Sequence, residues 1–467
     1  AGGGEVPHDY SGQALKALVM HEVGHTLGLR HNFRGSAGAS ASNIADREYT
    51  AAHGLGVSVM DYSPPSLALD SRRQGHYYAP TIGSYDRWAV TYGYSDVGGG
   101  DSTMRASKGG NRLESSWSPE LELNGLRAIA SEAADPAHLY GTDEDAGFGG
   151  YGLDPTVSRY DQTDDPLSWA KDRVELIDGL FDSLEIRVVP PGQSYGRLRG
   201  AFTDLLTDRW YALLVTTKYL GGATIARDHR DDPYGRPAFE TVPAERQRAA
   251  LQLIAQSGFG EDAYRFRPEL LSRLAPERWN HWGTKPPAGG RLDFPLHEWA
   301  LIQQGSLLGQ LLDPAVLSRI RDSELRAVEG EPTLGIPELF ATLTGAIWGE
   351  IGLPLPGQAL PGQALPGQAR AGAKSALPRN TTSVRRDLQR LHLNSMIRLV
   401  LSPAPGTPED ARTLARTTLA ELAVQLDRGL DSKAVLDPYT RAHLIDSRER
   451  ISQTLNAQMI QNASTTR

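Results

Sequence analysis

The stretch from His21 to His31 constrains the fold of this chain more than any other feature. It reads His-Glu-Val-Gly-His-Thr-Leu-Gly-Leu-Arg-His. On a helix, residues four apart lie about 40° apart in azimuth and about 6 Å apart along the axis, so the imidazoles of His21 and His25 can converge on one point. Glu22 is rotated by about 100° from His21, which places its carboxylate beside that point. The pattern predicts a helix that carries a metal site.

The third histidine requires the chain to leave that helix sharply. Gly28 can adopt the left-handed backbone that commonly ends a helix, and His31 can then turn back toward the first two imidazoles. Three neutral imidazoles at about 2.0 to 2.1 Å from Zn²⁺ leave a fourth position open for water, as in catalytic zinc sites. Zinc lowers the pKa of its water toward about 7, so Glu22 can act as general base. The spacing therefore predicts His21, His25 and His31 as zinc ligands.

Hydrophobic periodicity predicts a mainly α fold with little β structure. The first helix is expected from about residue 12 to 27 with Ser11 as its N-cap. Residues 35–56 are small and polar and predict a loop with little regular structure, and the best strand candidate is the short run 185–189. Further helices are expected at residues 85–92, 122–132, 167–184, 200–220, 243–256, 296–312, 336–351, 383–402, 408–430 and 438–460.

The same patterns divide the chain into five segments. A motif-bearing core at 1–95 is followed by Gly-rich and acidic loops at 96–165 and a helical domain at 166–352. Residues 353–378 contain Leu-Pro-Gly-Gln-Ala three times in succession. Proline and glycine in every five residues cannot propagate a helix, so this segment predicts a linker. Residues 379–467 predict a C-terminal helical segment.

Composition excludes several classes of partner. The 467 residues include 48 Lys plus Arg against 56 Asp plus Glu, a formal net charge of −8, and the basic residues form no run. A nucleic-acid partner is therefore disfavoured. No apolar stretch approaches the roughly 18 residues that would span a membrane. The cysteine count of zero rules out disulfides and thiolate-ligated metals but leaves the compartment open.

An acidic, glycine-containing stretch lies between residues 143 and 165. Hard carboxylate oxygens in such a loop are suited to Ca²⁺. A solvated acidic loop explains the same composition, and we favour it over a calcium site. The acidic residues concerned are Asp143, Glu144, Asp145, Asp154, Asp161, Asp164 and Asp165.

The segment Ser58-Val59-Met60-Asp61-Tyr62 follows the histidine motif. Together the two motifs resemble the metzincin clan of zinc peptidases, in which a methionine-bearing turn forms an apolar floor beneath the zinc. By this resemblance Met60 is the floor residue. The tyrosine two places later resembles the astacin and serralysin pattern, so Tyr62 would hydrogen-bond the developing oxyanion.

A more specific resemblance includes a third motif, Ile82-Gly83-Ser84-Tyr85-Asp86-Arg87-Trp88-Ala89. All three motifs resemble large bacterial zinc-dependent metallopeptidases with a metzincin-like domain of unknown function. The resemblance implies a secreted or periplasmic protein that hydrolyses a protein or peptide substrate. It does not imply which substrate.

The start of the chain departs from the metzincin pattern. Metzincins place a sheet before the active-site helix, and its edge strand binds the substrate backbone. Only about ten residues precede the helix here, so we expect an upstream segment or a second chain to complete the cleft. The first hypothesis is a zinc endopeptidase with Glu22 as base. The alternatives are a zinc-retaining binding or assembly protein without turnover, and a hydrolase of non-peptide amides.

Overall fold

The structure is a computed structural model that describes residues 7–97, 119–232, 235–276, 291–351 and 378–457. Helices dominate these ranges, as predicted, and none of them is long and apolar enough to cross a membrane. The repeat at 355–369 lies outside them. The elements are α1 (His8–Thr26), α2 (Ala41–Ala45), α3 (Arg47–His53), α4 (Ser84–Tyr94), α5 (Pro119–Ala130), α6 (Pro166–Phe181), α7 (Leu184–Val188), α8 (Gly196–Thr216), β1 (Ala223–Ile225), β2 (Phe239–Thr241), α9 (Ala244–Leu253), α10 (Pro268–Leu271), α11 (Leu296–Leu311), α12 (Pro314–Ser323), α13 (Ile336–Ile347), α14 (Ser383–Leu401), α15 (Glu409–Leu430) and α16 (Pro438–Asn456).

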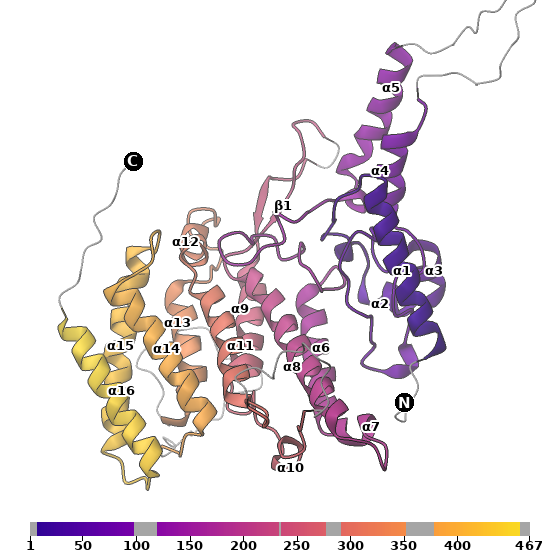
Figure 1. Cartoon of the computed structure of the whole chain (residues 1–467). Helices are drawn as coiled ribbons and strands as arrows, with labels where there is room; N and C mark the ends of the chain where they lie inside the picture. The colour runs from indigo at the N-terminus through magenta and orange to yellow at the C-terminus, as the bar shows by residue number, and fades with distance from the viewer. Residues whose placement is uncertain (1–6, 98–118, 233–234, 277–290, 352–377, 458–467) are drawn as a thin grey trace, which may run out of the picture.

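The long helices after residue 165 stand side by side in a row that leads away from the N-terminal part (Figure 1). Each packs on the next: α6 on α8, α8 on α11, α11 on α14, α14 on α15 and α15 on α16. One continuous apolar core, from Leu167 on α6 to Ile451 on α16, runs through this row. Each helix buries its apolar stripe against its neighbours, so the row forms a single scaffold.

Helix α1 belongs to the N-terminal part and is only half covered. His21 and Gly24 are buried on its inner face. Its outer face carries apolar side chains that are between 38% and 64% exposed. These are Leu15, Leu18, Val19, Val23 and Leu27. The outer face of α1 is therefore an exposed apolar surface.

Two sequence-based predictions about the N-terminal part need correction. Helix α1 begins at His8, with Pro7 as N-cap, so Ser11 lies inside it. The predicted loop at 35–56 contains α2 and α3. Their N-caps are Ser40 and Asp46, whose side chains accept hydrogen bonds from the exposed amides of the first helical turn. The small polar residues that suggested a loop are therefore helix caps.

The strand predicted at 185–189 is wrong, because residues 185–188 lie in α7 and Val189 is its C-cap. Leu184 is buried, and α7 lies against α8. A strand needs a hydrogen-bonded partner, and alternation over five residues does not supply one. The two strands of the described ranges are β1 and β2, which pair antiparallel with Ala223 opposite Thr241.

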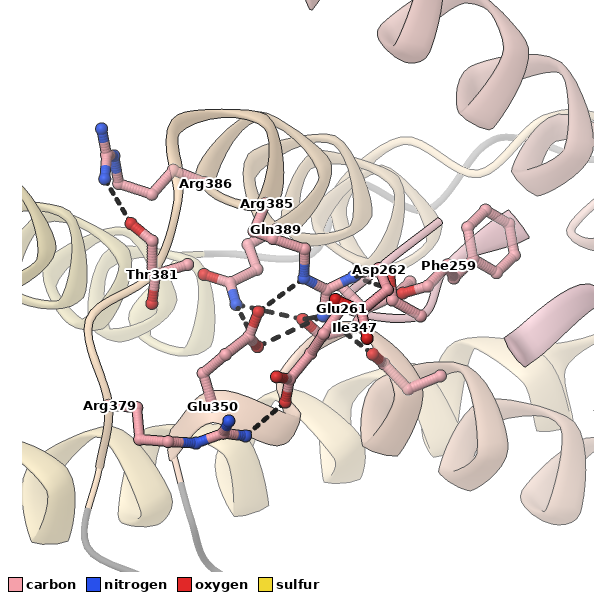
Figure 2. Close-up of polar contacts among 12 residues, drawn as sticks. Phe259, Glu261, Asp262, Ile347, Glu350, Arg379, Thr381, Arg385, Arg386 and Gln389 are labelled. Carbon is pink, nitrogen blue, oxygen red and sulfur yellow. Dashed lines mark hydrogen bonds and ion pairs between the residues drawn. The ribbon is translucent and has the colours of Figure 1, made fainter. Parts of the chain in front are cut away.

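A buried arginine joins four segments in the helical row (Figure 2). Arg385 on α14 forms a two-pronged ion pair with Glu350, at 2.5 and 3.2 Å. Its guanidinium also donates to the carbonyl oxygens of Ala346 and Ile347 at the end of α13, at 2.8 and 2.7 Å, and to Phe259 O. Carbonyls at a helix C-terminus have no partner within the helix. Arg385 satisfies them and fixes α14 against α13.

Candidate metal centre

Helix α1 positions the first two histidines. Their ring centroids are 4.7 Å apart. His21 Nδ1 lies 2.8 Å from Val59 O, and His25 Nδ1 lies 2.9 Å from Leu29 O. A carbonyl oxygen only accepts, so Nδ1 carries the proton in both rings. Each Nε2 is thereby left with a free lone pair.

The turn after α1 returns the third histidine to the other two. Gly28 has φ +87°, the left-handed conformation that its lack of a Cβ permits. The His31 ring then lies 5.4 Å from that of His21 and 4.9 Å from that of His25, centroid to centroid. One nitrogen atom from each of the three rings can be chosen so that all three nitrogens lie within 4.8 Å of one another. The structure thus brings together the three residues predicted as ligands.

The donor set fits a metal ion. His31 Nε2 is buried and has no hydrogen-bond partner among the described residues, which is costly unless a ligand fills the site. His31 Nδ1 lies 3.0 and 3.2 Å from the two carboxylate oxygens of Asp143, so it too is the protonated nitrogen. Three imidazoles with fixed Nδ1 protons are suited to zinc, with coordination through Nε2.

Burial favours the neutral form of His21. It lowers the pKa of His21, and the neighbouring His25 and His31 lower it further, against the opposing effect of the Val59 hydrogen bond. Metal ions bind the neutral imidazole. The surroundings of His21 therefore favour the form of this residue that binds a metal.

Met60 lies beneath the histidine helix, as the resemblance implied. Its side chain is fully buried, and a Cβ on Gly24 would overlap Met60 Sδ. Asp86 on α4 holds the turn, since its carboxylate accepts from Ser58 Oγ at 2.6 Å and from Val59 N at 2.8 Å. The role of Asp86 was missed from the sequence, although the third motif contains it.

Glu22 and Tyr62 both line a cavity of about 390 Å³ beside the histidines. Glu22 is exposed on α1. The Tyr62 ring lies 4.7 Å from that of His31 and 5.4 Å from that of His21. Burial raises the pKa of Tyr62, and the neighbouring Tyr160 raises it by a smaller amount. The Tyr62 hydroxyl therefore remains a hydrogen-bond donor at neutral pH. The predicted base and the predicted oxyanion donor therefore face the same cavity.

The acidic residues of the 143–165 segment form hydrogen bonds with different partners and do not converge on one point. Asp143 bonds to His31, Glu144 to Arg30 and Asp145 to Arg227. Within the described ranges, one group of three or more His, Asp or Glu side chains lies close enough together to hold a metal ion, and it consists of the three histidines. The calcium alternative therefore finds no support here.

Two further carboxylates form a buried pair that the sequence did not reveal. Ser36 bridges them: its amide donates to Asp61 Oδ2 at 2.8 Å and its hydroxyl to Asp161 Oδ1 at 2.9 Å. Asp61 Oδ1 and Asp161 Oδ2 are buried without a hydrogen-bond donor. Burial raises the pKa of Asp61 to about 7 and that of Asp161 well above its usual value. The pair holds the 154–165 loop against the methionine turn.

A histidine helix, a returning third histidine and a methionine floor define the class of a metzincin-type metal site. The sequence model of the family described as Met-zincin matches residues 3–353, well over half of the 467-residue chain. The chain belongs to the Met-zincin family. Comparison with curated proteins and with solved structures finds no match.

Proposed function

We propose that the chain is a zinc-dependent endopeptidase with His21, His25 and His31 as ligands. One observation carries this proposal: three imidazoles have their Nδ1 atoms bound to oxygen acceptors, and His31 Nε2 is buried without a partner. A structural zinc site would normally have four protein ligands, whereas three leave room for a reacting group. By resemblance, we place the enzyme in a secreted or periplasmic setting.

Zinc at this site would polarise a peptide carbonyl and lower the pKa of a water molecule. Glu22 is exposed at the edge of the same cavity, where its carboxylate takes the proton of the attacking water and returns it to the departing amine. Tyr62 donates its hydroxyl proton in a hydrogen bond to the carbonyl oxygen as negative charge develops there.

The cavity that Glu22 and Tyr62 share supplies a binding site for a substrate side chain. Its walls are largely apolar or aromatic, and its volume of about 390 Å³ accommodates a large side chain. The wall residues include Leu18, Leu55, Val59, Pro64, Tyr78 and Tyr160. We therefore propose that an apolar residue next to the scissile bond is preferred.

A second candidate function follows from the outer face of α1. The exposed stripe from Leu15 to Leu27 lies on the helix that carries Glu22. We propose that another polypeptide packs on this stripe. A zinc-retaining binding or assembly protein without turnover would use the same stripe for docking alone.

Digestion of casein and of a peptide library separates the two candidates. The zinc-loaded chain should cleave, and a chelator or Glu22→Gln should abolish cleavage while zinc remains bound in the variant. Glu48→Gln, at an exposed position on α3, is the matched control and should keep full activity. If stoichiometric zinc binds but wild type cleaves nothing that Glu22→Gln does not, the non-catalytic candidate replaces the peptidase.

A further inference from the structure

The three histidines differ in what holds their Nδ1 atoms. His21 and His25 use backbone carbonyl oxygens, whereas His31 uses the carboxylate of Asp143, 112 residues further along the chain. We propose that Asp143 is a positioning residue for the metal site, which fixes the tautomer and the orientation of His31. This inference rests on the zinc site of the proposed function but not on catalysis.

The segment that carries Asp143 is fastened to the residues just after His31. Asn32 is fully buried; its Nδ2 donates to Leu139 O and its Oδ1 accepts from Gly141 N, both at 3.1 Å. Phe33 N donates to Gly141 O at 2.7 Å. These bonds fix the register of the 139–143 segment relative to the third histidine. The hydrogen bonds of Asn32 and Phe33 thereby place Asp143 next to His31.

Arg159 holds Asp143 and the His31 ring together. Its Nη2 donates to Asp143 Oδ1 at 3.1 Å, and its guanidinium lies 4.9 Å from the centroid of the Phe33 ring. Phe33 in turn stacks on His31, with 5.0 Å between centroids and 28° between planes. The imidazole is therefore constrained at one face by Phe33 and at its Nδ1 edge by Asp143.

This arrangement has a direct chemical consequence for a bound metal. A carboxylate that accepts from Nδ1 keeps the lone pair on Nε2 and makes that nitrogen a stronger donor, and loss of such a partner typically weakens metal affinity by about 10- to 100-fold. Without Asp143, His31 loses the acceptor that selects its tautomer, and the stacking of Phe33 still contacts one face of the ring. His21 and His25 keep their backbone acceptors in any variant at position 143.

The next residue provides a matched control. Glu144 lies in the same segment and pairs with Arg30 at 2.7 Å, but both side chains are more than half exposed, at 67% and 55%. Glu144 does not hydrogen-bond any of the three histidines. Glu144→Ala therefore removes an equal charge from the same segment without touching a ligand.

Competition with a chromogenic chelator at neutral pH tests the proposal by zinc affinity. Asp143→Ala should bind zinc about 10- to 100-fold more weakly than wild type. Asp143→Asn should lie between the two, because the amide oxygen still accepts but the charge is lost. Glu144→Ala should match wild type within about twofold, since an exposed ion pair contributes little. Nitrogen NMR of the metal-free protein should show a single His31 tautomer in wild type and a mixture in Asp143→Ala.

The outcomes separate this inference from the proposed site. Zinc binding by wild type with equal affinity in Asp143→Ala overturns the role of Asp143 alone. No zinc binding by wild type overturns the metal site itself. Should circular dichroism show that Asp143→Ala is unfolded, Asp143→Asn decides, and equal affinity of that variant with wild type overturns the proposal.

Discussion

The histidine centre and the Arg385 junction are both polar clusters with buried nitrogen atoms, and they differ in how completely hydrogen bonds satisfy those atoms. At the junction, Arg385 donates to Glu350 and to carbonyls of two further segments, and Gln389 adds a bond to Glu350 Oε2 at 3.2 Å. At the histidine centre, His31 Nε2 is buried without a partner. A fully hydrogen-bonded network stabilises the fold, whereas an unpaired nitrogen lone pair is available to a ligand.

The Asp61 and Asp161 pair lies between these extremes. Each carboxylate has one oxygen bonded to Ser36 and one oxygen buried without a donor. Two carboxylates this deeply buried cannot both ionise without a large cost. A proton therefore balances part of the charge in this third cluster, together with the buried ammonium group of Lys218 near Asp161.

The largest effect on the free energy of unfolding is expected when the Arg385 junction loses its arginine. Arg385→Met leaves the Glu350 carboxylate buried without its ion-pair partner, which should lower the free energy of unfolding by about 3 to 5 kcal/mol. Urea unfolding measures this change. Arg265→Ala is the control, because its ion pair with Asp262 is 80% and 78% exposed and should contribute less than about 1 kcal/mol. Equal losses in the two variants would contradict the comparison.

Binding of zinc at the histidine centre should change the free energy of unfolding by a similar amount in the opposite direction. Zinc at about 1,000 times its Kd should raise the free energy of unfolding by about 4 kcal/mol. His25→Ala removes a proposed ligand and should abolish the gain, whereas His53→Ala on α3, an exposed histidine outside the group, should keep it. Thermal unfolding with and without zinc measures both. A gain that survives His25→Ala would place the metal elsewhere.

The carboxylate pair should make stability depend on pH. Burial raises the pKa of Asp61 to about 7 in the folded protein, against about 3.9 when unfolded. Between these values the folded state keeps a proton that the unfolded state has lost. The free energy of unfolding therefore falls as pH rises through this window, by up to about 1.4 kcal/mol per pH unit, and falls no further above about pH 7.

Asp61→Asn isolates that contribution, because the amide oxygen can still accept from Ser36 N but does not titrate. Unfolding of the metal-free proteins should show that the variant gains stability over wild type progressively from about pH 4 to about pH 7. Parallel curves for the two proteins would refute the assignment.

The smallest effect concerns the floor of the histidine centre. Gly24→Ala would bring a methyl group into Met60 Sδ, and overpacking of this kind costs about 1 to 3 kcal/mol. Gly12→Ala on the same helix has no atom within 4 Å of the new Cβ and should stabilise by about 0.5 to 1 kcal/mol. Chemical unfolding distinguishes the two signs. A neutral Gly24→Ala would mean that Met60 does not fix the position of α1.

Local spacing made the histidine centre predictable. His21 and His25 are joined by helical geometry, and Gly28 has the positive φ that the turn to His31 requires. The mainly α class follows in the same way from the periodicity of the long helices. Errors arose where a short segment can satisfy two patterns: the alternation at 185–189 lies in α7, and the polar run at 35–56 contains helix caps.

The supporting residues could not be predicted for a different reason. Asp143 reaches His31 across 112 residues, and Asp161 reaches Ser36 across 125. No periodicity or motif records such pairs, because they arise only when the 139–165 segment folds back onto the residues that follow α1. The composition of the segment therefore favoured a solvated acidic loop for Asp143. The chemistry of its side chain was plain in the sequence, but its partner was not.

The separation of Asp143 from His31 also sets an order of events while the chain is being made. At about 5 to 20 residues per second, a ribosome adds Asp143 roughly 6 to 22 seconds after His31. During that interval the imidazoles of His21, His25 and His31 exist in a nascent chain that lacks the acceptor for His31 Nδ1. On the role proposed for Asp143, tight metal binding would begin only after this residue has been added to the chain.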